Sequence, residues 1–132
     1  MTLTAAPEHS AVILIDLKKP RIRIYKNTLH ALGDPSHIDL FINPETHTIG
    51  IGCGSPEDML SHRISRKQMQ EKPCIELYSS SLITALKKMF PEWSENYNYR
   101  IRGAVVPGKK VARFRMEDAV PVLKVKEMPD GQ

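Results

Sequence analysis

The chain has 132 residues, of which 41% are hydrophobic and 26% are charged, and its formal net charge is +4. This is the composition of an ordinary globular protein, so a wholly disordered chain is excluded and a single domain is expected. The longest apolar run, residues 11–15, is too short to cross a bilayer and lacks the flanks of a signal peptide, so we expect a cytoplasmic protein without a membrane partner. Cys53 and Cys74 suit that compartment as free thiols.

The first half of the chain predicts strands, one short helix and a hairpin. The expected elements, in chain order, are strand 12–17, strand 22–25, helix 28–32, strand 38–42 and strand 49–51. Gly33 is suited to end the helix, because glycine readily adopts the left-handed conformation found after a helix C-terminus. If Ile42 opposes Ile49 in the hairpin, then Leu40 opposes Ile51, and both apolar pairs share one face.

The second half repeats this order after residues 54–71, a segment without a clear period. The expected elements are strand 75–78, helix 81–90, strand 97–105, strand 110–116 and a final short strand 120–125. The helix carries an apolar stripe that includes Leu82 and Leu86, and Pro91 lies beyond its end.

Residues 19–29 recur as residues 72–82, and both segments read K-P-x-I-x-[IL]-Y-x-x-[ST]-L. Since an internal repeat is stronger evidence about a fold than local pattern, we expect a single domain, residues 1–132, made of two strand–helix–strand–strand units. Its parts are repeat one (18–53), the inter-repeat segment (54–71), repeat two (72–116) and a C-terminal strand and tail (117–132). The predicted fold class is α+β, mostly β, as a pseudo-two-fold barrel. The predicted core is Ile22, Ile24, Leu29, Leu40, Ile75, Leu77, Leu82, Ile101 and Phe114.

The basic excess of the chain belongs to repeat two, and most of it lies on the second hairpin. The arginines of this hairpin are Arg100, Arg102, Arg113 and Arg115. A turn centred between residues 107 and 108 would oppose Arg102 to Arg113 and Arg100 to Arg115 on one face, and Ile101 to Phe114 on the other face. Like charges directly opposite each other are destabilising, and arginine is suited to bidentate phosphate contacts, so this face favours an anionic partner. The alternative is a solvated face whose arginines pair with nearby acids, namely Glu92, Glu95 or Glu117.

Two further groups of residues are candidates for binding. Arg21 and Arg23 lie on the polar face of strand 22–25, where they either contact phosphates or are simply solvated. Tyr25 and Tyr78 occupy equivalent positions of the two repeats, and each either stacks on a base or ligand ring or packs against the neighbouring half.

A third candidate group is His62, Arg63 and Arg66 in the inter-repeat segment. If this segment is helical, His62 and Arg66 lie on the same face of the helix, and the group could bind a phosphate or a nucleotide. The alternative is a surface loop that only connects the two halves.

The order of Arg21-Ile22-Arg23-Ile24, a short helix ending at Leu32-Gly33 and a hairpin resembles the half-barrel of the AbrB/MazE swapped-hairpin family. Proteins of that family normally need two chains to complete their barrel, so the resemblance implies that a duplicated chain could complete it alone. It also implies DNA binding through arginines in the region of Arg21 and Arg23. Repeat two departs from the pattern, with a longer helix and Ala85-Leu86 where Leu-Gly would stand.

The sequence contains none of the common motifs of nucleotide hydrolases, serine hydrolases or zinc proteases, so we expect no enzyme activity, no cofactor and no metal site. The favoured hypothesis is a small cytosolic DNA-binding regulatory protein whose arginines contact phosphates. Two alternatives stay open. One is a protein that binds or sequesters a nucleotide-like or other phosphorylated small molecule, between the repeats or between the protomers of a homo-oligomer. The other is a scaffold module for a partner protein.

Overall fold

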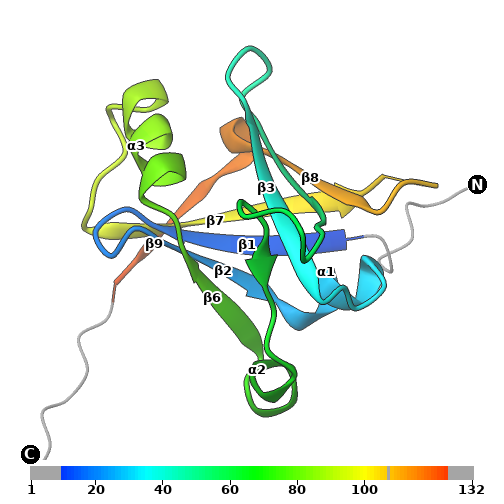
Figure 1. Ribbon diagram of the computed structural model, residues 1–132. Helices are drawn as coiled ribbons and strands as arrows, with labels where there is room; N and C mark the ends of the chain where they lie inside the picture. Colours follow the sequence, from blue (N-terminus) through cyan, green and yellow to red (C-terminus); the bar gives the residue numbers. More distant parts are fainter. Residues whose placement is uncertain (1–9, 107, 125–132) are drawn as a thin grey trace, which may run out of the picture.

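The computed structural model describes residues 10–106 and 108–124, and these residues form a nine-stranded antiparallel sheet with three α-helices around it (Figure 1). The elements are β1 (Ser10–Asp16), β2 (Arg21–Tyr25), α1 (Lys26–Ala31), β3 (His37–Asn43), β4 (Thr48–Cys53), β5 (His62–Arg63), α2 (Arg66–Glu71), β6 (Cys74–Tyr78), α3 (Ser80–Met89), β7 (Tyr97–Val105), β8 (Val111–Arg115), the 3₁₀ turn η2 (Met116–Asp118) and β9 (Val120–Leu123). The predicted mostly-β class is confirmed. The last residue of the predicted final strand, residue 125, lies outside the described residues.

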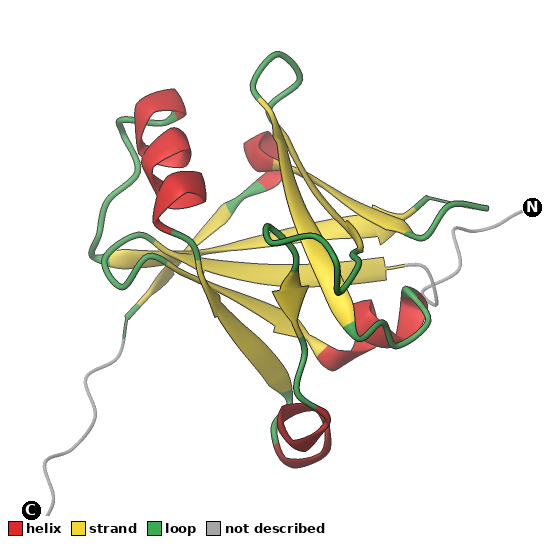
Figure 2. Cartoon of the chain, viewed as in Figure 1, coloured by secondary structure: helices red, strands yellow, loops and turns green. Residues whose placement is uncertain are grey.

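The sheet curls into a nearly closed barrel (Figure 2). Its hydrogen-bonded order is β5-β3-β4-β8-β7-β1-β2-β6, and β9 pairs with β7 outside this path. The order ends at β5 and β6, which follow each other in the chain and are connected by α2. The barrel therefore has one open seam, between β5 and β6.

The hydrophobic core fills the inside of the barrel, because alternate residues of each strand point inward. Ile22 and Ile24 of β2, for example, are fully buried, whereas Arg23 between them faces out. All the predicted core residues are buried except Leu40, which is half-buried against the core. The predicted β3–β4 hairpin is also confirmed, with Ile42 opposite Ile49 and Leu40 opposite Ile51.

The predicted register of the β7–β8 hairpin is wrong by two residues. Phe114 lies opposite Gly103 and not opposite Ile101, and Arg113 lies opposite Ala104 and not opposite Arg102. The chain reverses between Val106 and Val111, whose backbone groups are hydrogen-bonded at 2.8 Å, so the turn is centred one residue later than expected. Gly103 has no side chain, and this leaves room for the Phe114 ring, which is completely buried. Pro107, at the predicted turn centre, lies outside the described residues.

Candidate functional site

The outer face of β7 and β8 carries the four arginines singled out in the sequence: Arg100, Arg102, Arg113 and Arg115. Each of them is exposed, and the residues between them point into the core. The prediction that they share one face is therefore confirmed, although they are not arranged in the two predicted opposed pairs. Three of them, from both strands, line an open groove of about 610 Å³ together with Asp118; these three are Arg102, Arg113 and Arg115. Arg100 lies instead in a smaller hollow of about 410 Å³ beside Tyr25 and Lys26.

The charges of these arginines are largely uncompensated within the described part of the chain. Arg115 is paired with Glu117 at 3.7 Å, and both side chains are more than half exposed, so this pair is weak. Glu95 is paired with Lys87 at 2.9 Å and is not available to the arginines. Among the described residues, no carboxylate lies within ion-pair distance of Arg100, Arg102 or Arg113. Among the described residues, Arg115 is therefore the one arginine of this face that forms an ion pair with an acidic side chain.

Arg21 and Arg23, which we expected to contact phosphates, form ion pairs with acidic side chains. Arg21 donates to Asp16 at 3.1 Å and to Glu76 at 2.7 Å, and Arg23 donates to the same oxygen of Glu76 at 2.8 Å. Arg21 is only 9% exposed. Its guanidinium is thus a structural link between β1, β2 and β6, and it is not available to a polyanion.

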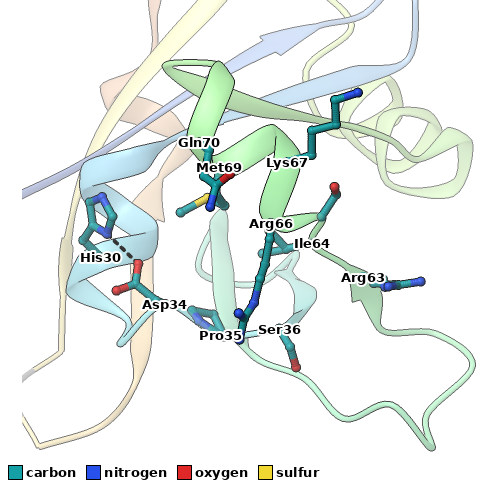
Figure 3. Close-up of a pocket in the computed structure, with 11 residues that line it drawn as sticks. His30, Asp34, Pro35, Ser36, Arg63, Ile64, Arg66, Lys67, Met69 and Gln70 are labelled. Carbon is teal, nitrogen blue, oxygen red and sulfur yellow. Dashed lines mark hydrogen bonds and ion pairs between the residues drawn. The ribbon is translucent and has the colours of Figure 1, made fainter.

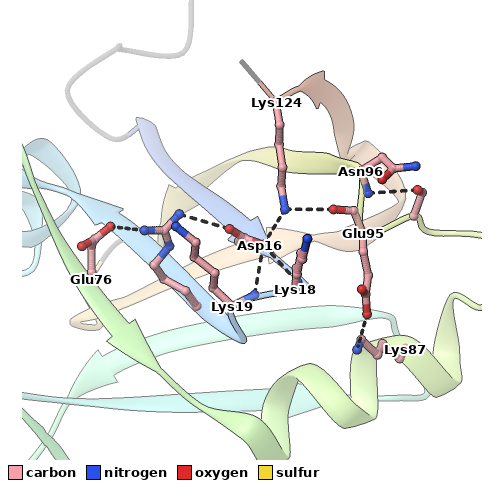
Figure 4. Close-up of polar contacts among 10 residues, drawn as sticks. Asp16, Lys18, Lys19, Glu76, Lys87, Glu95, Asn96 and Lys124 are labelled. Carbon is pink, nitrogen blue, oxygen red and sulfur yellow. Dashed lines mark hydrogen bonds and ion pairs between the residues drawn. The ribbon is translucent and has the colours of Figure 1, made fainter. Parts of the chain in front are cut away.

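Asp16 is the centre of this network, and the sequence had not indicated it. Its carboxylate accepts hydrogen bonds from the backbone N–H groups of Lys18 and Lys19, and from Lys124 Nζ at 2.8 Å (Figure 4). Burial raises the pKa of Asp16, but the hydrogen bond from Lys124 and the two backbone hydrogen bonds outweigh burial, so its pKa lies below the usual range. The hydrogen bond from Arg23 likewise lowers the pKa of Glu76.

We therefore expect the free energy of unfolding to fall as the pH is lowered through about 4, the usual pKa of these carboxyl groups in an unfolded chain. Groups with a lowered pKa in the folded state stabilise the protein above that pH, and this stabilisation is lost as the pH falls further through their folded pKa. Urea denaturation at a series of pH values measures the effect. The Glu76→Gln variant should have a lower free energy of unfolding at neutral pH. This free energy should also fall less steeply than that of the wild type as the pH is lowered. A fall of unchanged steepness would contradict a role for Glu76 in acid sensitivity.

The two candidate tyrosines lie at opposite ends of the paired strands β2 and β6. Tyr25 is opposite Cys74, and Tyr78 is opposite Arg21. Tyr78 is 62% exposed and borders a groove at the open seam of the barrel, which also contains His62. Because the strands are antiparallel, the two rings cannot close on one ligand.

The inter-repeat residues do not form the predicted group. His62 and Arg63 form a short strand, and the helix begins only at Arg66, so the predicted shared face of His62 and Arg66 is wrong. Arg63 and Arg66 do line one pocket of about 760 Å³, together with Lys67 (Figure 3). Figure 3 shows that Arg66 crosses this pocket, whereas Arg63 and Lys67 point away from it. The cations diverge, which is unfavourable for holding a single phosphate.

Within the described residues, none of the helices is long and apolar enough to cross a membrane. Cys53 and Cys74 are free thiols, as expected. Comparison with known proteins gives no match: no family model, no curated protein and no solved structure matches this chain. The function has to be inferred from the geometry and the charges of the candidate site.

Proposed function

We propose that the chain is a non-enzymatic DNA-binding protein of AbrB-like build, which holds phosphates with the arginines on the outer face of β7 and β8. The observation that carries the proposal is the position of Arg100, Arg102 and Arg113, exposed on one face with no carboxylate partner among the described residues. Arg115 adds a fourth charge to the same face. Arginine is suited to this role because its planar guanidinium can bind phosphate oxygens in a bidentate manner.

The shape of the site also favours a long anionic partner. Arg102, Arg113 and Arg115 border an open groove, and Arg100 extends the charge along β7 beyond it. β7 and β8 are flanked by β1 and β4 in the sheet, so the arginines lie on a broad surface along which a long anion can extend. A small phosphorylated ligand is less well matched, because it would need cations that converge on one point, and those around the pocket at α2 diverge.

We also propose that the barrel is a pseudo-two-fold duplication, as the repeated sequence predicts. Exchanging β1 with β5, β2 with β6, β3 with β7 and β4 with β8 leaves the cyclic order of these strands unchanged, with the β5–β6 seam corresponding to the β1–β2 pair. Arg23 and Glu76 occupy the same position in the two repeats, and they are direct partners in the β2–β6 pair. Both observations are what a local two-fold axis between the repeats would produce.

The test is a double substitution, Arg102→Ser with Arg113→Ser, measured for binding to duplex DNA. We expect binding to weaken by about 2–4 kcal/mol, on the scale of two charge-assisted contacts. The wild-type protein, with about four phosphate contacts, should lose roughly two decades of affinity between about 50 and 200 mM salt, and the variant should show a shallower salt dependence. Thermal unfolding should be unchanged, since both side chains are exposed.

A matched control removes the same number of positive charges from another surface. Arg66→Ser with Lys67→Ser changes α2, where both side chains are exposed, and should leave DNA binding nearly unchanged. Equal losses in the two double variants would mean that only net charge matters. If the wild-type protein binds neither duplex nor single-stranded DNA at low salt, the DNA proposal is wrong, and the phosphorylated-ligand and scaffold alternatives stay open.

A further inference from the structure

Phe41 is a large apolar residue that lies on the outside of the barrel. It belongs to the outward-facing set of β3, between the inward-facing residues Leu40 and Ile42, and it is 52% exposed. Its ring lies along β4, over two glycines. A methyl group placed on Gly50 would lie 3.6 Å from Phe41 Cδ2, and one placed on Gly52 would lie 3.3 Å from Phe41 Cε2. One side of the ring therefore covers the glycines, and solvent reaches its other side.

This ring is on the same face of the sheet as the arginines. Phe41 is the register partner of Gly50, Gly50 is the partner of Arg113, and Arg113 is the partner of Ala104. All of these residues point outward, so they form one row across β3, β4, β8 and β7. Since neighbouring strands are about 4.8 Å apart, the backbone of Phe41 is roughly 10 Å from that of Arg113. Only glycine lies between them, and the surface along this row is consequently flat.

We infer that this outer face binds single-stranded nucleic acid, with a base stacked on Phe41 and the adjacent phosphates held by Arg113 and Arg115. The inference rests on the proposed DNA-binding function and adds single strands to the ligands of this face. Aromatic rings next to cations are the combination that single strands favour, because bases stack on the ring and the cations follow the backbone. Base and phosphate are joined through one sugar, and the long arginine side chains span the remaining distance.

The geometry selects a single strand over a duplex for this part of the surface. In a duplex both sides of each base are already covered by neighbouring bases, so a ring that lies flat on a sheet has no base face to contact. Asp39, which precedes Phe41 on the outward face of β3, lies on the side away from Arg115. Its negative charge directs the phosphates toward the arginines.

The experiment compares a labelled oligothymidylate of about 16 nucleotides with the duplex of the same length, using Phe41→Leu and the control Phe41→Tyr. Leucine keeps an apolar cover on the glycines but has no aromatic face, so the affinity for the single strand should fall about tenfold, while the affinity for the duplex stays within about twofold. Tyrosine keeps the ring and should bind both ligands as the wild type does. Phe41→Trp adds a direct readout, since its fluorescence should be quenched by the oligothymidylate, after correction for Trp93 in the wild-type protein.

The outcomes separate this inference from the function on which it rests. If Phe41→Leu binds the single strand as well as the wild type, or Phe41→Trp is not quenched at saturating oligothymidylate, the inference is wrong. The DNA proposal then still stands if Arg102→Ser with Arg113→Ser weakens duplex binding. If the wild-type protein binds neither ligand at low salt, both are wrong. Equal losses for both ligands in Phe41→Leu with a lowered melting temperature would mean that Phe41 is structural, which also overturns the inference.

Discussion

Replacing Asp16 by Asn is expected to lower the free energy of unfolding by about 3–5 kcal/mol, the usual cost of breaking a buried ion pair. Asp16 is 4% exposed, and its carboxylate is shared by Arg21, Lys124 and two backbone N–H groups. An amide can still accept a backbone hydrogen bond, but it cannot balance the charge of Arg21. That guanidinium would remain buried, with Glu76 as its remaining ion-pair partner.

Urea denaturation at neutral pH measures this loss, and Asp58→Asn is the matched control. Asp58 is exposed, and its side chain accepts a hydrogen bond from the backbone N–H of Leu60, which asparagine can also accept. The control should change the free energy of unfolding by no more than about 0.5 kcal/mol. If Asp16→Asn is equally harmless, the Asp16–Arg21 pair does not stabilise the fold, and Arg21 becomes a candidate for phosphate binding again.

Replacing Gly103 by Ala is expected to destabilise the protein by about 3 kcal/mol or slightly more, at the upper end of the cost of overpacking a core. A methyl group at this position would lie 2.1 Å from the backbone oxygen of Arg113 and 2.6 Å from Cδ1 of Phe114. Neither atom can move easily, since one belongs to the β8 backbone and the other to a completely buried ring. The β7–β8 pair would have to separate, and this pair carries the arginine face.

The same substitution at Gly50 is a control within the same sheet. A methyl group there meets its nearest neighbour, Phe41, at 3.5 Å, which is an ordinary van der Waals contact. Gly50→Ala should therefore be tolerated within about 1 kcal/mol, since alanine also restricts the unfolded chain more than glycine does. Thermal and urea denaturation of Gly103→Ala and Gly50→Ala measure the two losses of stability. Similar stabilities for the two would mean that β7 and β8 do not approach each other as closely at Gly103 as described.

Local patterns in the sequence were sufficient to predict the buried face of β2 and of the β3–β4 hairpin, whereas β5 was not predicted as a strand. The alternation of Ile22 and Ile24 with Arg21 and Arg23 determines the inner and outer faces of β2, because successive side chains of a strand point to opposite sides. The β3–β4 register was predictable for a related reason. Its turn is short, and a shift by one residue would have moved Ile49 and Ile51 out of the core.

The β7–β8 register was not predictable in this way. A slip of two residues keeps every side chain on its own face, so the apolar pattern does not distinguish the two alignments. The packing of Phe114 against the space left by Gly103 decides between them, and such complementarity of size exists only when both strands and the rest of the core are in place. The same slip separates Arg113 from Arg102, so the two predicted arginine pairs do not form, and the register that pairs Gly103 with Phe114 brings Arg102 level with Arg115 instead.

Contacts between distant parts of the chain were decided by the tertiary structure alone. Asp16 and Lys124 are 108 residues apart, and the pairing of β7 with both β1 and β9 brings them together. The predicted hairpin had already placed Phe41 opposite Gly50, but the pairing of β4 with β8 put Arg113 on the other side of that glycine. Sequence periodicity records which side of a strand faces water, because burial acts on each residue separately. Which residues meet across the sheet depends on strand order, which is determined by how all the strands pack around a common core.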